Sequence, residues 1–382
     1  MTGFQPPEPP PGETVLLATA QPMPLAQGGA LGPVRIAYRS WGRLNRERSN
    51  AILIDHALSG DQYVTGINPV TGRAGWWDRM VGPGKPIDTD RYFVLASNVL
   101  GGCMGSTGPA SIDVRTGRAY GPDFPPISIS DMVAAQALLL DSLGIDTLFL
   151  VVGGSMGGMQ ALQWLKDRPG RVFASAAFAA GARHSPQQIA LHMIGRQAIA
   201  ADADWQDGRY HGSGRAPLRG LAVARMLAHL SYRAPGELEA RFGRRPSALP
   251  VEPTDPAALR YEVERYIAHQ GNRFPARFDA ASYMTITRAM DDFELAPRDR
   301  LAEAFADADA RVFLAAFDSD WLYPPAETEE LAIAMRKAGL DVDFAVHRAI
   351  AGHDSFLLET PGLDEAFRRF LDRAAEARGL LP

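Results

Sequence analysis

The chain has 382 residues and a formal net charge of −5; 46% of its residues are hydrophobic and 22% are charged. This composition is that of a globular enzyme, and a negative charge without any basic run argues against a nucleic-acid-binding surface. No stretch approaches the roughly 20 apolar residues that span a membrane, and the N-terminal segment lacks the pattern of a secretory signal. The single cysteine, Cys103, excludes an intrachain disulfide and a cysteine-rich zinc site, so we expect a cytoplasmic protein.

The first part of the chain alternates predicted strands with predicted helices. Its proline-rich beginning, residues 1–13, is expected to form a disordered arm. Helices are predicted over residues 132–144, with Ser130 as the N-cap, and over residues 159–165. Apolar, β-rich runs predict strands at residues 34–38, 50–55, 92–96, 147–152 and 172–180, the first of them at a sheet edge. This alternation predicts a mostly parallel sheet with right-handed crossovers.

The stretch from residue 183 to residue 305 breaks this alternation. It shows no convincing strand, and an all-helical insertion between two parts of one α/β domain is typical of a lid. Its helical patterns cover residues 186–202, 218–232, 256–270 and 281–290. The alternation then returns, with strands predicted at residues 311–317 and 342–346 and helices at residues 327–337 and 362–376. We therefore expect a core of residues 1–182 and 306–382 and a helical lid of residues 183–305.

A serine follows the predicted strand at residues 147–152, in the sequence GGSMGG. Gly153, Ser155 and Gly157 match the G-x-S-x-G pattern, in which a strained turn between strand and helix exposes the serine hydroxyl. Glycines suit this turn because larger side chains would clash there. A glycine-rich loop that only ends a strand is the alternative, but strand, turn and helix occur in the order that a nucleophilic serine requires. Ser155 is therefore the candidate nucleophile.

A serine hydroxyl needs a histidine to accept its proton and a carboxylate to orient that histidine. In this type of sheet the acid and then the histidine follow the serine, each in a loop after a strand. His353, in AGHDSF after the last predicted strand, is the candidate base; His56 precedes the serine, His347 lies within that strand, and the other five histidines lie in the insertion. Asp318 and Asp320 both follow the preceding strand, and their spacing alone does not decide between them.

Acyl transfer through a serine also requires two backbone N–H groups that stabilise an oxyanion. The N–H of Met156, directly after the serine, is one candidate. The N–H of Leu58, in the HALSG loop after the strand at residues 50–55, is the other, and His56 then shapes that loop. Hydrolases and acyltransferases share such a site, but a lid of this size favours transfer because it excludes water.

Several long motifs resemble those of the homoserine O-acyltransferases. They are HALSGD, GWWDRMVGPGKPIDTDRYFVLASNVLGGCMGSTGPAS, GGSMGGMQALQW, RGLAVARMLAHLSY, RFDAASY, SDWLYPP and GHDSF. The resemblance extends from about residue 34 to residue 372 and includes the predicted lid. It implies an α/β-hydrolase fold with a helical lid, usually dimeric, that makes O-acylhomoserine from homoserine and an acyl-coenzyme A on the route to methionine.

The resemblance also assigns roles to individual residues. Ser155 corresponds to the family's nucleophile, Asp320 to its acid and His353 to its base. Arg225 corresponds to an arginine that binds the substrate, and its guanidinium fork suits a carboxylate. Asp354 corresponds to a second substrate-binding residue, which we expect to bind the ammonium group.

The chain departs from the family pattern in one helix, and a position after the acid bears on the acyl group. In the first predicted lid helix, Gln187–Gln188 and His192–Met193 replace a Gln-Asn pair and an Asn-Glu pair, which leaves pocket contacts from this helix unpredicted. Succinyl-using relatives tend to carry an arginine two residues after the acid, where this chain has Leu322. An apolar side chain at that position favours the neutral acetyl group over succinyl.

The sequence therefore predicts an acetyltransferase in which Ser155 takes the acetyl group of acetyl-coenzyme A and passes it to L-homoserine in a ping-pong reaction. It predicts small-molecule substrates, no metal, no tightly bound cofactor, no nucleic-acid or membrane partner, and a homodimer formed through the lid helices. The alternatives are succinyl transfer to homoserine or serine, a carboxylesterase with the same triad, and a binding protein without catalysis.

Overall fold

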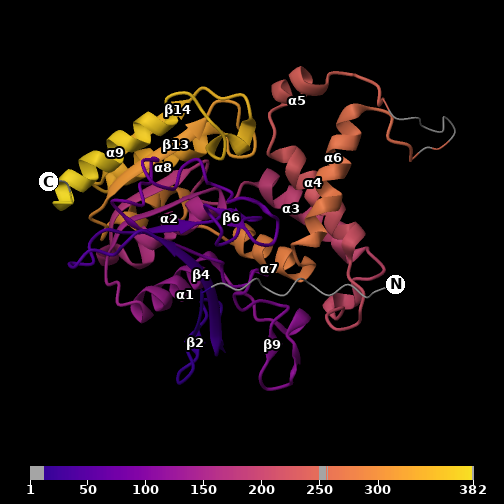
Figure 1. The fold of residues 1–382 in the computed structure, drawn as a ribbon, viewed down its shortest axis with the longest axis horizontal. Helices are drawn as coiled ribbons and strands as arrows, with labels where there is room; N and C mark the ends of the chain where they lie inside the picture. The colour runs from indigo at the N-terminus through magenta and orange to yellow at the C-terminus, as the bar shows by residue number, and fades with distance from the viewer. Residues whose placement is uncertain (1–12, 249–254, 256, 381–382) are drawn as a thin grey trace.

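The computed structural model describes residues 13–248, 255 and 257–380. Eight strands form one sheet in the order β1-β4-β8-β5-β11-β12-β13-β14 (Figure 1). The six strands from β8 to β14 are parallel, and β4 and β1 extend the sheet with antiparallel pairings. The prediction of a mostly parallel sheet is therefore confirmed. The strands are β1 (Glu13–Leu17), β4 (Val34–Trp41), β5 (Ala51–Asp55), β8 (Phe93–Ser97), β11 (Leu148–Gly154), β12 (Val172–Phe178), β13 (Arg311–Phe317) and β14 (Asp341–His347).

Within the described residues, the remaining elements are short strand pairs and helices. The pairs are β2 (Met23–Pro24) with β3 (Ala30–Leu31), β6 (Ile67–Asn68) with β7 (Arg73–Ala74), and β9 (Ile112–Asp113) with β10 (Arg118–Ala119). The α-helices are α1 (Ile129–Ser142), α2 (Met156–Asp167), α3 (Pro186–Ala200), α4 (Leu218–Ser231), α5 (Pro235–Phe242), α6 (Glu262–Arg273), α7 (Ala280–Asp291), α8 (Pro325–Lys337) and α9 (Leu363–Arg378). The 3-10 helices are η1 (Gly121–Asp123), η2 (Pro169–Arg171), η3 (Gln206–Gly208), η4 (Phe274–Ala276), η5 (Arg298–Phe305) and η6 (Gly352–Phe356).

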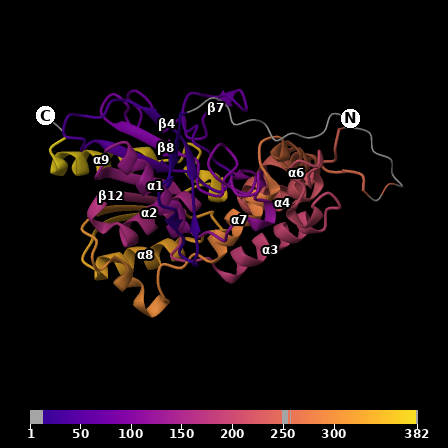
Figure 2. The ribbon, with the colours of Figure 1, turned by 90° about the horizontal axis from the view of Figure 1, so that it is seen from below.

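Helices cover both faces of the sheet because side chains alternate along each buried strand. In β5, Leu53 belongs to a core cluster with residues of α1, α2 and α8, whereas Ile52 and Ile54 belong to a second cluster with residues of α9. Figure 2 accordingly shows α8 and α9 on opposite sides of the strands. The parallel strands end at a common edge, so the loops after β5, β11, β13 and β14 meet there.

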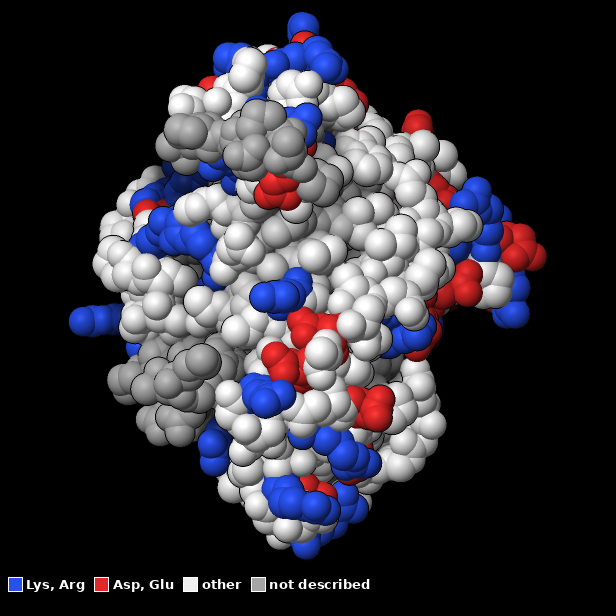
Figure 3. Space-filling view, turned by 90° about the vertical axis from the view of Figure 1, so that its right-hand side faces the viewer, with Lys and Arg blue, Asp and Glu red and all other residues white. Residues whose placement is uncertain are grey.

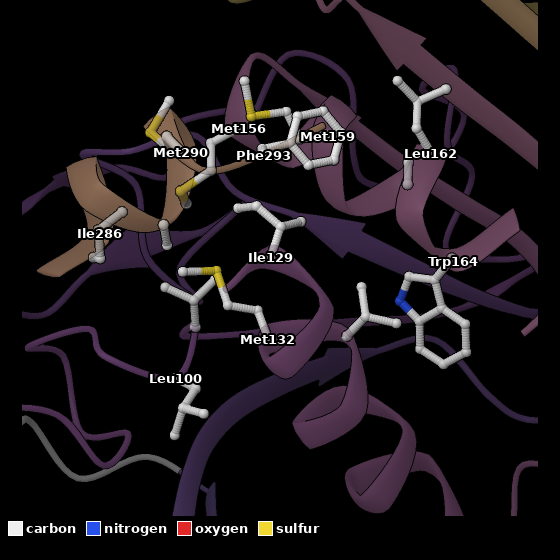
Figure 4. Packing of buried hydrophobic residues seen from close by; sticks show 14 of the residues in the cluster. Leu100, Ile129, Met132, Met156, Met159, Leu162, Trp164, Ile286, Met290 and Phe293 are labelled. Carbon is white, nitrogen blue, oxygen red and sulfur yellow. The ribbon is translucent and has the colours of Figure 1, made fainter. Parts of the chain in front are cut away.

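Helices α3 to α7 form a group beside the sheet (Figure 1). Within it, α3 packs against α4, and α4 packs against α6. Helix α7 links this group to the core, because Met290 and the nearby Phe293 share a buried cluster with Ile129 of α1 and with Met156 and Met159 of α2 (Figure 4). Among the described residues between β12 and β13, none adds a strand to the eight-stranded sheet. The helical insertion is thus present, and its boundaries at residues 183 and 305 remain predictions.

The strand predicted at residues 34–38 is present as part of β4, but the prediction that it lies at a sheet edge was wrong. Strand β1 pairs antiparallel with β4 along its whole length, from Glu13 opposite Tyr38 to Leu17 opposite Val34. Glu13 therefore belongs to a strand, while residues 1–12 of the predicted arm lie outside the described residues.

The predicted N-cap of α1 was also wrong. The cap is Ser128, because it forms a capping box with Asp131. The N–H of Asp131 donates to Ser128 Oγ (3.2 Å), and the N–H of Ser128 donates to Asp131 Oδ2 (2.8 Å). Ser130 instead donates its hydroxyl hydrogen to Asp167 from within the helix.

Two lid helices differ from the prediction. Helix α6 begins at Glu262, later than expected, where the N–H of Tyr261 donates to the Glu264 carboxylate and caps the first turn. Helix α5 was not predicted, because its sequence PGELEARF begins with a proline and a glycine, which are poor helix formers except in a first turn. Within the described part of the chain, no helix is long and apolar enough to cross a membrane.

Candidate active site

Ser155 lies on a sharp turn between β11, which ends at Gly154, and α2, which begins at Met156. Its φ of 56° and ψ of −123° are strained values for a residue with a side chain, and its N–H donates to the carbonyl oxygen of Phe178 (2.9 Å). The flanking glycines are required sterically, because a Cβ on Gly157 would lie 2.0 Å from the carbonyl oxygen of Asp55. The backbone thus makes the sharp turn from strand to helix that the G-x-S-x-G pattern predicts.

His353 and Asp320 form a buried pair at the same edge of the sheet. His353 lies in η6, after β14, and Asp320 lies in the loop after β13; His353 Nδ1 and Asp320 Oδ2 are 2.8 Å apart. The other carboxylate oxygen accepts the N–H groups of Leu322 and Tyr323, both at 2.9 Å, which fixes the carboxylate. Because Asp320 accepts the hydrogen on Nδ1, Nε2 is left as a proton acceptor. Among the described residues this buried Nε2 has no hydrogen-bond partner.

Asp318 occupies a different position in the same loop. Its Oδ1 accepts the N–H of Ala349 (2.8 Å), and its own N–H donates to the carbonyl oxygen of His347 (3.1 Å). Asp318 thus holds two loops together, and of the two candidate acids it is Asp320 that contacts the histidine.

Two chains of contacts connect His353 with Ser155. The Tyr323 ring stacks on the His353 ring with centroids 4.9 Å apart, and the Tyr323 side chain lines a cavity together with Ser155. The Phe356 ring packs on His353 with centroids 5.8 Å apart, and it lies so near Gly154 that a Cβ there would be 2.4 Å away. His353 and Ser155 therefore lie on either side of the same aromatic side chains.

The two candidate oxyanion donors come from segments that lie side by side. The pairing of β5 with β11 sets Asp55 opposite Gly153, which brings the loop containing Leu58 next to the elbow. Within the described residues, neither the N–H of Leu58 nor the N–H of Met156 donates a hydrogen bond. Two unpaired N–H groups, that of Met156 at the start of α2 and that of Leu58 in the adjacent loop, suit a developing negative charge.

His56 shapes this loop rather than acting as a base. Its Nε2 accepts the N–H of Val99 (3.1 Å), and burial lowers the pKa of the imidazole to about 4. The His56 imidazole is therefore neutral, and its Nε2 already accepts a hydrogen bond.

A small cavity of about 20 Å³ lies over Ser155. Leu58, Leu322 and Tyr323 belong to its core side, and residues of α3, α4 and α7 form the opposite side. This volume is close to that of a single water molecule.

Helix α3 does reach this cavity, although its sequence departs from the family pattern. Gln188 is buried, and its Nε2 donates to the carbonyl oxygen of Leu322 (2.7 Å) and to Oε2 of Glu327 (3.2 Å). Its Oε1 accepts the N–H of Ser185 (2.6 Å). Burial raises the pKa of Glu327 to about 7. Gln188 thereby ties the helical insertion to the loop that carries Asp320.

A second polar cluster at the cavity was missed by sequence reasoning. Asp291 Oδ1 lies 3.2 Å from His184 Nδ1 and 2.7 Å from His192 Nδ1, while Asp291 Oδ2 lies 2.7 Å from an Arg196 nitrogen. His184 Nε2 in turn lies 2.6 Å from the Tyr323 hydroxyl. Burial raises the pKa of Asp291, but hydrogen bonds from both histidines outweigh it and hold that pKa low. Burial lowers the pKa of His184 to about 4, so this ring is neutral and Tyr323 donates to it.

Arg225 and Asp354 lie near these groups. Arg225 Nη1 is 3.2 Å from the hydroxyl of Ser59, next to Leu58, and its guanidinium lies over the Tyr232 ring. Asp354 Oδ2 is 3.2 Å from Arg233 Nη1. Burial raises the pKa of Asp354, and the charges of Arg233 and Arg225 oppose this rise. Arg233 is a partner that sequence reasoning did not identify.

The sequence of the chain matches a family model described as the alpha/beta hydrolase fold over residues 50–359. The homoserine O-acetyltransferase of Nitrobacter hamburgensis is 51% identical over 373 residues, which are 97% of this chain and 93% of that protein. The enzyme of the same name from Caulobacter vibrioides is 49% identical over 384 residues and is matched over the full length of both chains.

Solved structures of two kinds resemble the fold. A homoserine O-acetyltransferase from Bacillus anthracis superposes with a TM-score of 0.86 at 28% identity, over 94% of this chain and 97% of that one. Esterase E22 superposes with a TM-score of 0.84 at 26% identity, over 94% of this chain and 99% of that one.

The geometry predicts different effects for the two aspartates after β13. In Asp320→Asn the amide donates to Nδ1 and places the imidazole hydrogen on Nε2, which then accepts no proton. We expect the rate of Ser155 acylation by p-nitrophenyl acetate to fall by about four orders of magnitude. The matched variant Asp318→Asn should lower the melting temperature but keep most of the rate. A larger loss of rate in Asp318→Asn than in Asp320→Asn would contradict the assignment.

Proposed function

We infer the activity of this chain from its family: it belongs to the homoserine O-acetyltransferases, and it transfers the acetyl group of acetyl-coenzyme A to the hydroxyl group of L-homoserine. This conclusion rests on the comparison with enzymes of that name: about half of the residues are identical, and the match extends over nearly the full length of the chain. The product, O-acetyl-L-homoserine, serves methionine synthesis. A cytoplasmic location stays a prediction, which cell fractionation would check.

We propose that Ser155 is the nucleophile of a ping-pong reaction. His353 Nε2 takes the Ser155 proton as Oγ attacks the thioester carbon, and Leu58 and Met156 donate their N–H groups to the oxyanion. The C–S bond breaks, and the coenzyme A sulfur leaves with the proton from His353. The homoserine hydroxyl then attacks the acetyl-serine while His353 takes its proton, and that proton returns to Ser155 Oγ. The close pairing of Asp320 with His353 supports these roles.

Arg225 and Asp354 are the proposed ligands of the homoserine amino-acid group. The Arg225 guanidinium lies beside the Leu58–Ser59 loop, where it would bind the carboxylate. The partly buried carboxylate of Asp354 would bind the ammonium group, in addition to its present partner Arg233. The opposite charges of Arg225 and Asp354 match the opposite charges of the substrate.

The small cavity supports acetyl as the transferred group. Leu322 lines this cavity and presents an apolar side chain to it. A succinyl group would bring a carboxylate into this space, and a buried carboxylate without a cation is costly. We propose that residues 183–305 act as the lid that closes the cavity, because α3, α4 and α7 form its roof.

One assay tests this function. Purified protein is mixed with acetyl- or succinyl-coenzyme A and with homoserine or serine, and free thiol and ester product are both measured. We expect the fastest turnover with acetyl-coenzyme A and homoserine, an acetylated Ser155 in rapid-quench mass spectrometry, and no turnover in Ser155→Ala. Faster turnover with succinyl-coenzyme A or serine would contradict the proposed substrates.

The same assay distinguishes the second candidate, a carboxylesterase. The structural likeness to esterase E22 favours this alternative. An esterase would release acetate at a rate that homoserine does not change, and it would form no O-acetylhomoserine.

Arg225→Lys tests the carboxylate contact. Lysine keeps the charge but loses the two-pronged hydrogen bond, so we expect kcat/KM for homoserine to fall about tenfold or more. Acylation of Ser155 by p-nitrophenyl acetate should not change, because this step precedes homoserine binding. The exposed Arg219 on the same helix supplies the control variant Arg219→Lys. An unchanged kcat/KM in Arg225→Lys would remove Arg225 from the site.

We propose that the chain forms a homodimer through α3 and α4. The face that carries the inserted helices shows wide areas without charged side chains (Figure 3). Large apolar side chains on these two helices are between 38% and 50% exposed: Ile189, Met193, Ile194, Leu218, Val223 and Leu230. Such a surface is typical of an interface between protein chains.

Sedimentation analysis tests the dimer. We expect a species of twice the 41.3 kDa chain mass, and a shift to the single-chain mass in Val223→Arg, where a charge is placed in the interface. Ile333→Arg, at an exposed apolar position on α8, should not change the mass. A wild-type protein that sediments at 41.3 kDa would contradict the proposal.

A further inference from the structure

A hydrogen-bonded network of four buried side chains, two of them glutamine amides, lies beneath the elbow. Trp164 Nε1 donates to Gln136 Oε1 (2.8 Å), and Gln136 Nε2 donates to Gln160 Oε1 (2.8 Å) and to Asp55 Oδ1 (2.8 Å). Gln160 Nε2 donates to the carbonyl oxygens of Met156 (3.2 Å) and His56 (3.4 Å). All four side chains of this network are buried, and Gln160 is 0% exposed. The mechanism described above uses none of them.

The donors and acceptors of these side chains allow each glutamine amide only one orientation. The indole nitrogen of Trp164 is a donor only, so it must face the oxygen of Gln136. The amide nitrogen of Gln136 then donates both hydrogens, one of them to the oxygen of Gln160. Gln160 is therefore left with its nitrogen facing two carbonyl oxygens, and its two hydrogens are both used. Such a network is rigid because any amide flip would leave buried groups unpaired.

The two carbonyl groups that Gln160 binds belong to separate segments of the proposed oxyanion hole. His56 lies two residues before Leu58, in the loop after β5, and Met156 is the residue directly after Ser155. On the strand side, the two segments touch where the Gly157 backbone meets the carbonyl group of Asp55. The Gln160 side chain bridges the same segments from within α2. The loop is thus attached to the helix at two points, which limits its rotation about either one.

We propose that Gln160 is a positioning residue that sets the separation of the N–H groups of Leu58 and Met156. This inference rests on the proposed function, in which these groups bind the oxyanion. Hydrogen bonds to a transition-state oxygen require donors placed within about half an ångström, so loosening the loop weakens the oxyanion hole without removing a donor. Gln160 therefore influences the stability of the transition state, whereas the binding of homoserine depends on other groups.

The test compares Gln160→Met with Gln163→Met on the same helix. Gln163 is also buried, but its amide donates to Asp167 and not to the loop. Two quantities are measured: the rate of Ser155 acylation by p-nitrophenyl acetate, and the affinity for methylboronic acid, which adds to Ser155 Oγ and forms a tetrahedral anion. In Gln160→Met we expect both to fall about tenfold, a fraction of the loss caused by removing one donor. The KM for homoserine should stay unchanged, and Gln163→Met should keep wild-type values of both quantities.

Gln160→Glu supplies a second variant of the same shape. A buried glutamic acid keeps one hydrogen to donate while it is neutral and none once it ionises. We expect the acylation rate of Gln160→Glu, divided by the wild-type rate at the same pH, to be highest at low pH and to decline as pH rises; the division removes the titration of His353, and a merely structural defect would not produce this trend. If Gln160→Met fails to fold, this variant decides. Wild-type acylation rate and boronate affinity in the folded variants would overturn the proposal.

These readouts do not depend on the transfer of acetyl to homoserine. Wild-type protein that is acylated on Ser155 and binds the boronate, but makes no O-acetylhomoserine, would overturn the proposed function and leave the role of Gln160 intact. Wild-type protein that neither reacts at Ser155 nor binds the boronate would overturn both.

Discussion

The first turn of α2 lies directly against the end of β5, and this backbone contact constrains the groups around it. A Cβ on Gly157 would lie 2.0 Å from the carbonyl oxygen of Asp55, so a glycine is what allows helix and strand to approach so closely. The chain must therefore turn from strand to helix within one residue, which gives Ser155 its φ of 56°. The same approach brings the loop after β5 to the elbow, so that the N–H groups of Leu58 and Met156 are held by segments fixed to each other. The position of Ser155 and the strain in its backbone thus both follow from this close contact between helix and strand.

The side of the site opposite the sheet is fixed by hydrogen bonds that cross between the helices of the proposed lid and the core. Gln188 of α3 donates to the carbonyl oxygen of Leu322, two residues after Asp320. His184, just before α3, meets the hydroxyl of Tyr323, whose ring stacks on His353. Separating α3 from this loop would leave buried polar groups unpaired, at a cost of about 1–3 kcal/mol for each group. The beginning of α3 is therefore anchored to the acid loop, and the proposed acid and base are positioned by the lid as well as by their own strands.

The sequence predicts the part of the site that follows from chain order and sheet topology. A glycine-flanked serine after a buried strand and a histidine after the last strand are expected on the same side of the molecule, because parallel strands end at one edge. The choice between Asp318 and Asp320 depends on side-chain direction within one loop, and the structure shows this direction: Asp318 faces Ala349. The contact of His184 with Tyr323 joins residues 139 positions apart and depends on how the insertion packs on the core, which no local pattern encodes. The cap of α1, by contrast, was readable in the sequence, since Ser128 and Asp131 have the spacing of a capping box.

Acyl transfer and ester hydrolysis share this fold, as the likeness to esterase E22 shows, so the elbow alone does not determine which alcohol or water attacks the acyl-serine. The environment of the cavity bears on that choice. The polar side chains that α3 contributes to its wall are already paired: His192 with Asp291, and Gln188 with Leu322 and Glu327. A hydrolytic water would have to be oriented by the base alone, whereas homoserine brings charged groups that Arg225 and Asp354 are proposed to bind. Transfer is then favoured because homoserine is held in place by its own charges, whereas a water molecule has no charged groups for Arg225 and Asp354 to bind.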